Sequence, residues 1–203
     1  MAKVLFLNAK TVGKDMAGPG IRVWELAKVI GKENKVSIIL PSKNVFLEII
    51  RNEIIVFPIY SLDLAWLLLA RLLRKKIVID AYFVPLFENI EKYNGQPRLK
   101  KWVVNISKLR TKCLLLTGDL VLCASERQCS YWLEQFSAYG RKAARMEIAP
   151  TGIRSERPIK KHDLIKGIVP GISRDDKVVL WASGLWPWLD PMTAIKAIRL
   201  VED

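Results

Sequence analysis

Two glycine-bearing segments of this sequence have the composition of anion-binding turns. In the first, Gly18-Pro19-Gly20 follows the loop 9–17 and stands at the start of a helical pattern. Glycine lets the backbone approach a ligand closely, and the free N–H groups and dipole of a helix N-terminus favour an anion such as a diphosphate. The dinucleotide fingerprint would need a third glycine where this chain has Val23, and no Walker loop is present. The segment predicts a phosphate-facing turn, with a turn that binds nothing as the alternative.

The second segment, 182–191, carries Gly184, Trp186 and Asp190. It follows an apolar run that predicts a strand over Lys177–Ser183, and open α/β sheets bind ligands at the carboxyl ends of their strands. Asp190 and Pro191 also have the pattern of an N-cap and a first helical residue, and the helix they open is expected to continue to about Glu202.

Polar residues also stand where other predicted strands end. Asp80 ends one strand, Ser125 and Glu126 follow a second, and Gly152 follows a third. Ser125 has the spacing of a capping box with Gln128, so capping is its alternative role. A turn is the alternative for Gly152.

The three cysteines form no CxxC pair and the chain has a single His, so we expect no metal site.

The elements that would position these residues follow a regular alternation. Short apolar runs, typical of buried strands, occur at Val4–Asn8, Val36–Leu40, Ile54–Pro58, Ile77–Asp80, Leu120–Cys123 and Met146–Ala149. Helical patterns occur at Ile21–Lys32, Leu62–Leu73, Arg98–Thr117 and from Ser125 to about Gly140. The alternation predicts βαβ units and an α/β fold with a doubly wound, Rossmann-like parallel sheet.

The first helical pattern has two clear faces. Its apolar face carries Val23, Leu26, Ala27 and Ile30, and its polar face carries Arg22, Glu25 and Lys28. This is the pattern of an amphipathic helix, with Arg22 on the face opposite the apolar one.

The composition along the chain predicts two unequal domains. Residues 1–152 have enough strands and helices to form a lobe, and 153–176 are charged and punctuated by Pro and Gly, as in a linker. Residues 177–203 offer one strand and one helix, too little to close a core. We expect them to be the start of a second, incomplete lobe.

The chain is strongly basic, with 33 Lys and Arg against 20 Asp and Glu and a net charge of +13. Between 96 and 113, Trp102 is interleaved with six basic residues and no acidic one: Arg98, Lys100, Lys101, Lys108, Arg110 and Lys112. Such a surface attracts anionic lipid headgroups, with a solvated helix face as the alternative. Arg71, Arg74, Lys75 and Lys76 form a second cluster. No pattern of a nucleic-acid-binding module is present.

The longest apolar run, 62–73, is too short to span a membrane, and no signal peptide opens the chain. We expect a cytoplasmic protein, peripheral at the inner face of the membrane if the basic surface binds lipid.

Three segments in order resemble glycosyltransferase family 4, of the GT-B architecture: AGPGIRVWELA at 17–27, LCASERQ at 122–128 and LWASGLWPWLDP at 180–191. The resemblance covers an N-terminal lobe and the first βα unit of a C-terminal lobe. It implies a retaining transferase that moves a sugar from a nucleotide-diphosphate donor to an acceptor hydroxyl, for polysaccharide or glycolipid synthesis. It implies no metal and no cofactor beyond the donor.

The resemblance also implies roles for residues. Gly18, Gly20 and Arg22 would face the donor diphosphate across a cleft, and Gly184, Trp186 and Asp190 would open the donor site from the second lobe. Ser125, Glu126 and Gly152 would lie on the cleft edge.

The resemblance is to the subgroup of this family that carries a Trp-x-Trp-Leu-Asp-Pro turn, and the chain departs from that subgroup at the end of the fourth strand. A second acidic residue is typical shortly after the Asp of the fourth strand, but here Phe83 follows Tyr82. Asp80 is then the one acidic candidate to contact the acceptor or the reacting sugar, with capping of a strand end as its alternative.

The chain by itself is expected to be inactive, since one side of the cleft is missing. The alternative function is a non-catalytic basic module that binds an anionic membrane or a partner protein.

Overall fold

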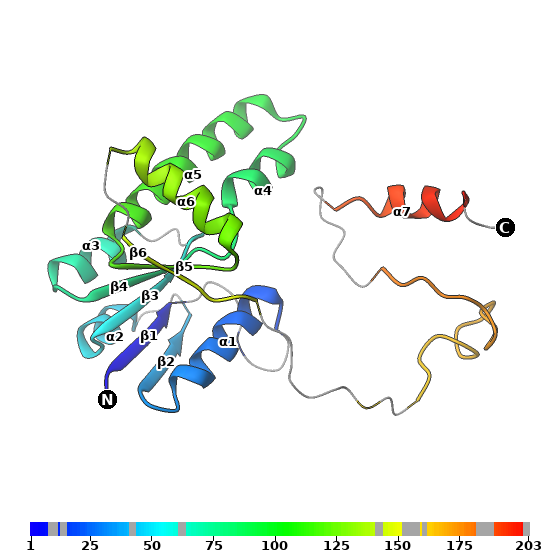
Figure 1. Ribbon diagram of the computed structural model, residues 1–203, viewed down its shortest axis with the longest axis horizontal. Coiled ribbons are helices and arrows are strands. Elements are labelled where there is room, and N and C mark those ends of the chain that lie inside the picture. The colour runs from blue at the N-terminus through cyan, green and yellow to red at the C-terminus, as the bar shows by residue number, and fades with distance from the viewer. Residues whose placement is uncertain are drawn as a thin grey trace. The chain divides into compact units, whose positions relative to one another are not determined.

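The computed structural model describes residues 1–7, 12, 16–40, 44–60, 64–140, 144–151, 159, 162–181 and 189–200. The chain divides into two compact units, Met1–Gly152 and Ile153–Asp203. Figure 1 shows the ribbon of the chain.

The first unit is built on one parallel sheet of six strands in the order β2-β1-β3-β4-β5-β6. The strands are β1 (Lys3–Leu7), β2 (Lys35–Ile39), β3 (Ile54–Pro58), β4 (Lys76–Asp80), β5 (Leu120–Cys123) and β6 (Arg145–Ile148). All pairs are parallel, with Val4 opposite Val36 and Ile54, and Asp80 opposite Pro58 and Leu122. This confirms the predicted α/β class with a Rossmann-like parallel sheet, and each of the six strands lies within one residue of its prediction.

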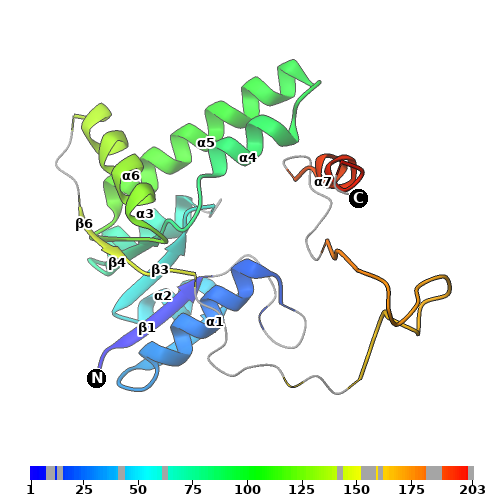
Figure 2. The ribbon, with the colours of Figure 1, turned by 45° about the vertical axis from the view of Figure 1, so that its right-hand side comes forward.

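Seven helices lie in the described residues: α1 (Gly18–Ile30), α2 (Val45–Arg51), α3 (Leu64–Leu72), α4 (Pro85–Lys92), α5 (Pro97–Thr117), α6 (Glu126–Ala138) and α7 (Pro191–Ile198). Figures 1 and 2 show α1 on one side of the sheet and α5 and α6 on the other. The pattern did not predict α2 and α4. They have seven and eight residues, which gives an apolar period too few turns to repeat clearly.

The core has two layers because alternate strand residues point to opposite faces. Under α1, one apolar cluster is formed by Val4, Phe6, Val23, Ala27 and Val56. On the other face, side chains from α2, α3, α5 and α6 pack with the intervening strand residues, among them Leu5, Ile77 and Val121. Strands covered on both faces have continuous apolar sequences, which is why the strand predictions were accurate.

The second unit differs from its prediction. Residues 177–181 of the predicted strand Lys177–Ser183 form no strand. A strand is held by hydrogen bonds to a neighbouring strand, and the described residues of this unit contain none to pair with. The rest of that prediction lies outside the described residues.

The cap predicted at Asp190 is confirmed. Its Oδ1 accepts a hydrogen bond from the backbone N–H of Thr193 at 3.1 Å, and α7 begins at Pro191. The helix ends at Ile198, before the expected Glu202, which lies outside the described residues. No helix in the described ranges combines the length and the apolar character needed to cross a membrane.

Candidate functional site at the carboxyl edge of the sheet

The chain direction creates a switch point between β1 and β3. From β1 the chain passes to β2 on one side and then returns to β3 on the other side of β1. Open α/β sheets bind ligands outside the carboxyl ends of the strands at such a point. The N-terminus of α1, which follows β1, lies at this edge (Figure 1).

The first turn of α1 offers two backbone donors at this edge. The helix begins at Gly18, earlier than predicted, and the first bond of the helix is donated by Ile21 to the carbonyl of Ala17 at 3.0 Å. Pro19 has no N–H, and Ala17 has no side-chain oxygen to cap the turn. The N–H groups of Gly18 and Gly20 therefore precede the first helical bond. Gly20 is buried, whereas Gly18 is exposed and a Cβ added there would meet nothing within 4 Å.

A buried ion pair joins this helix to the end of β4. Arg22 Nη2 donates to Asp80 Oδ1 at 2.7 Å, and Nε lies 3.0 Å from Oδ1 and 2.9 Å from Oδ2. Arg22 is 4% exposed and Asp80 is 2% exposed. The predicted site residues Arg22 and Asp80 are thus in direct contact. Each satisfies the charge of the other.

Two further contacts complete the surroundings of Arg22. Its Nη1 donates to the carbonyl of Ala149, just after β6, at 2.8 Å. Its guanidinium carbon lies 5.1 Å from the centroid of the Tyr82 ring, within the range of a cation–π contact. Through Arg22, the first turn of α1 is tied to the ends of both β4 and β6.

The amphipathic pattern groups Arg22 with Glu25 and Lys28, yet the Arg22 side chain is buried. Its side chain turns toward the sheet because Asp80 lies on the same face of the sheet as α1, in line with Val78. A signal for this was present in the sequence. An acidic residue at the end of an otherwise apolar strand needs a positive partner, since an unpaired buried charge is strongly unfavourable.

Burial raises the pKa of the Asp80 carboxyl, and the hydrogen bond and charge of Arg22 act in the opposite direction. Both carboxylate oxygens accept hydrogen bonds from Arg22. In this arrangement Asp80 orients Arg22, and a direct contact with an acceptor would need the surrounding side chains to move.

An aromatic cluster that the sequence analysis missed borders the pair. The ring centroid of Phe83 lies 5.7 Å from that of Tyr60 and 4.9 Å from that of Tyr82. Burial, with a smaller effect of the nearby Asp80 charge, raises the pKa of Tyr60 to about 12. Both tyrosines are therefore neutral at physiological pH, since the pKa of Tyr82 is also raised by burial.

At the next strand end, Ser125 caps α6 as the capping box predicts. Its Oγ accepts from the backbone N–H of Gln128 at 3.3 Å. Gln128 returns the contact with Oε1, which accepts from Ala124 N–H at 2.9 Å, and its Nε2 donates to the carbonyl of Tyr82 at 2.8 Å. Glu126 is exposed in the first turn. Besides its predicted capping role, Gln128 links α6 to the end of β4.

The structure therefore gathers Gly18, Gly20, Arg22, Asp80, Ser125 and Glu126 at one edge of one sheet. Gly184, Trp186 and Gly152 lie outside the described residues. Asp190 belongs to the second unit, where hydrogen bonds from Thr193 lower its pKa. No three His, Cys, Asp or Glu side chains in the described part of the chain come together as metal ligands would.

Burial also predicts a loss of stability in alkaline solution. It raises the pKa of the Cys123 thiol, which is hydrogen-bonded to Cys129, from 9.0 to about 12, and it raises the pKa of Tyr60, Tyr82, Tyr131 and Tyr139. The unfolded chain loses these protons first, so the free energy of unfolding should fall above about pH 9, by up to about 1.4 kcal/mol per pH unit for each group. Urea unfolding between about pH 7 and pH 11 measures this, and Cys123→Ala should delay the onset of the fall. Identical pH profiles for the two proteins would exclude Cys123 as a cause.

The fold and the position of these residues define the class of this protein: an α/β protein with a Rossmann-like parallel sheet and a polar site at its carboxyl edge. Comparison with known proteins adds no family to that class, because the chain matches no protein-family model and no curated protein matches it significantly.

Proposed function

We propose that this chain is the acceptor lobe of a retaining GT-B glycosyltransferase similar to family 4, together with the start of its donor lobe. The enzyme would transfer a sugar from a nucleotide-diphosphate donor to an acceptor hydroxyl, in polysaccharide or glycolipid synthesis. The proposal is carried by one observation. The two N–H groups that precede the first bond of α1 belong to Gly18 and Gly20, at the switch point of a parallel sheet.

In this proposal the backbone of α1 binds the leaving diphosphate. Negative charge develops on the diphosphate as the glycosidic bond to the donor breaks, and preoriented N–H groups stabilise it without reorganisation. The absence of a side chain at Gly18 leaves room for the phosphate to approach. Arg22 is buried and paired with Asp80, so we assign it the role of holding the first turn of α1 in place.

The second lobe would supply the other half of the donor site. We propose Gly184, Trp186 and Asp190 for this face, on the resemblance of 180–191 alone. Ser125 and Glu126 would border the acceptor side of the cleft, where Tyr60 and Tyr82 add neutral hydroxyl groups.

Substitution of Gly18 by valine tests the diphosphate assignment. We expect amide chemical-shift changes at residues 18–22 when the chain is titrated with nucleotide-diphosphate sugars, with weak affinity of about 1 mM because one lobe provides the contacts. Gly18→Val should abolish these changes, because its side chain occupies the approach to the amides. Its free energy of unfolding should stay within about 0.5 kcal/mol of the parent value, since the position is open.

Lys28→Gln is the control for this titration, because it alters an exposed charge on the same helix without closing the turn. If shifts at 18–22 are absent in the parent chain, or persist in Gly18→Val, the assignment of the turn is wrong.

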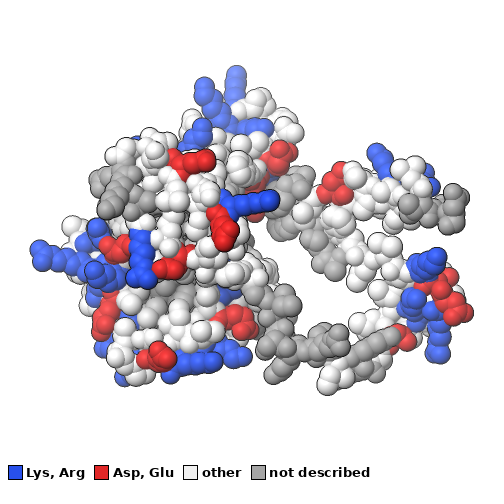
Figure 3. All heavy atoms as spheres, in the orientation of Figure 1, with Lys and Arg blue, Asp and Glu red and all other residues white. Residues whose placement is uncertain are grey.

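We also propose that α4 and α5 attach the protein to an anionic membrane. The two helices form a hairpin that extends beyond the sheet (Figures 1 and 2). Lys and Arg gather there in Figure 3. On α5, Arg98, Lys101, Lys108 and Lys112 are exposed, whereas Lys100 and Arg110 are half-buried. Trp102 is 63% exposed and Leu109 58% exposed, so apolar side chains are available to enter a headgroup layer.

The hairpin surface is tested by sedimentation with phosphatidylglycerol vesicles. Binding is expected at low salt and should be lost at high salt, because the Debye length is about 10 Å at 0.1 M and shortens as salt rises. The double variant Arg98→Gln, Lys101→Gln should bind more weakly. The control Lys28→Gln, Lys32→Gln removes the same charge from exposed positions near the end of α1. Equal weakening by both pairs would mean that net charge acts without a defined surface.

The same vesicle experiment addresses the alternative function. Vesicle binding together with no shift at residues 18–22 would favour a non-catalytic membrane-binding module over the transferase.

A further inference from the structure

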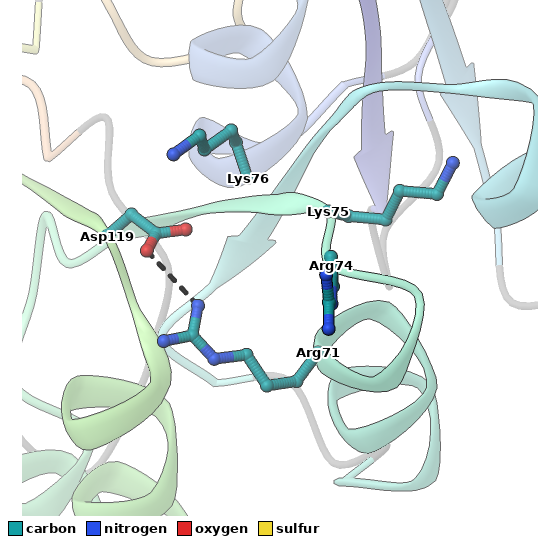
Figure 4. Close-up of a pocket in the computed structure, with 5 residues that line it drawn as sticks. All are labelled: Arg71, Arg74, Lys75, Lys76 and Asp119. Atoms are coloured by element: carbon teal, nitrogen blue, oxygen red, sulfur yellow. Dashed lines mark hydrogen bonds and ion pairs between the residues drawn. The ribbon is translucent and has the colours of Figure 1, made fainter.

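A basic hollow lies at the amino edge of the sheet, at the opposite ends of the strands from the candidate site. It is lined by Arg71, Arg74, Lys75, Lys76 and Asp119, from the end of α3, the turn into β4 and the residue before β5 (Figure 4). The four basic residues are already close together in the sequence. The fold adds Asp119 and places all five residues around one hollow.

One acidic residue faces these four basic residues within the hollow. Asp119 Oδ1 lies 3.1 Å from Arg71 Nη1, and its Oδ2 accepts the backbone N–H of Ile77 at 2.8 Å. Asp119 is thereby held by the backbone, and it holds the Arg71 guanidinium toward the hollow, as Figure 4 shows. The carboxylate is already shared between a backbone amide and Arg71.

Among the other basic side chains, Lys75 already has a hydrogen-bond partner. Lys75 donates from Nζ to the carbonyl of Ile50 at 2.7 Å and points away from Asp119 in Figure 4. Arg74 and Lys76 are exposed, and neither forms an ion pair with a described residue. Two uncompensated cations thus stand beside an oriented guanidinium. Like charges that line one hollow repel one another, and an anion bound there would relieve the repulsion.

The backbone of Arg74 closes the C-terminal end of α3. Its φ is +53°, and the N–H of Lys75 donates to the carbonyl of Ala70 at 2.9 Å, as in a helix end that is closed by a left-handed residue. Glycine is favoured in this conformation, so an arginine there is less stable than a glycine would be.

We propose that this hollow binds an anion with two linked phosphate groups. The planar guanidinium groups of Arg71 and Arg74 match phosphate oxygens in a bidentate manner, and Lys76 adds a point charge. A single phosphate could be neutralised by two of the cations, whereas a diphosphate uses all three. The diphosphate belongs either to a soluble molecule or to a lipid headgroup. The proposal is independent of the proposed transferase activity.

Calorimetric titration of the chain with pyrophosphate tests the site. Arg74→Gly is the informative variant because it separates binding from stability. We expect its melting temperature to rise by about 2–4 °C, since glycine relieves the backbone, while its affinity for pyrophosphate falls about tenfold or more. Lys76→Gln should weaken binding to a similar degree. Lys28→Gln, an exposed control on α1, should change the affinity by less than about twofold.

A second arm identifies the source of the diphosphate. Vesicles of phosphatidylcholine, with and without farnesyl diphosphate, are sedimented with the chain and with Arg74→Gly. Binding of these vesicles without binding of pyrophosphate assigns the site to a lipid. Binding of pyrophosphate without binding of these vesicles assigns it to a soluble diphosphate, and binding of both means that the site accepts either source. In each case Arg74→Gly must lose the interaction.

The proposal is overturned if neither probe binds, or if Arg74→Gly and Lys76→Gln bind as the parent does. It is also overturned if Gly18→Val removes the pyrophosphate signal while the two pocket variants retain it, because the ligand would then lie at the carboxyl edge. Since Gly18 and Arg74 lie at opposite edges of the sheet, failure here leaves the test of the transferase unaffected.

Discussion

Asp80→Asn is expected to destabilise the first unit by about 3–5 kcal/mol, because it leaves the Arg22 charge buried without its counter-charge. The substitution preserves the shape of the side chain, so the loss reports on charge and hydrogen bonding rather than on packing. Arg22 is 4% exposed and cannot turn to water without withdrawing from Ala149 and Tyr82. Urea unfolding followed by tryptophan fluorescence gives the change in free energy.

Two comparisons make the Asp80 prediction specific. Glu147→Gln breaks the exposed pair with Arg145 and should cost less than about 1 kcal/mol. The double variant Arg22→Met, Asp80→Leu should recover most of the stability lost in Asp80→Asn, since apolar replacements of a buried pair are often neutral. A loss below about 1 kcal/mol for Asp80→Asn would mean that Arg22 reaches solvent or another anion.

The Asp80 result also governs how the donor titration is interpreted. A loss of the shift changes at residues 18–22 in Asp80→Asn would not by itself make Asp80 a donor ligand, because the variant is expected to disturb the first turn of α1. The stabilised double variant separates the two roles. If that variant folds and keeps the shift changes, neither side chain contacts the donor.

Trp132→Ala is expected to cost about 3–5 kcal/mol, the loss typical of truncating a buried aromatic side chain. Trp132 is 1% exposed and lies in the larger apolar cluster with Phe136. Its indole Nε1 donates to the carbonyl of Ala81 at 3.1 Å, directly after Asp80. Trp132 therefore stabilises both the core and the carboxyl end of β4.

A second variant separates these two contributions of Trp132. Trp132→Phe keeps most of the packing but leaves the Ala81 carbonyl without the indole donor, which should cost about 1–3 kcal/mol beyond the lost volume. Trp102→Ala, at an exposed position, is the control and should stay within about 0.5 kcal/mol of the parent chain. Similar unfolding curves for Trp132→Ala and Trp102→Ala would contradict the burial of Trp132.

The sequence by itself determined the elements whose signals are local. Six strands, the cap at Ser125 and the cap at Asp190 were predicted because apolar runs and capping spacings involve neighbouring residues. The helices α2 and α4 were missed because they have seven and eight residues, too few turns for an apolar period to repeat clearly. The strand predicted over Lys177–Ser183 was wrong for its described residues, since a strand also depends on a neighbour that local sequence cannot supply.

For the candidate site, the sequence supplied the residues, and the tertiary structure decided which of them are in contact. Arg22 and Asp80 are 58 positions apart, and periodicity, which considers the helix alone, places Arg22 on the polar face. The sheet order brings the end of β4 under α1, and a buried carboxylate there draws the arginine inward. The link from Gln128 to Tyr82 and the basic hollow around Asp119 depend in the same way on strand order. Such contacts join residues whose spacing in the sequence has no period, and so only the folded chain defines them.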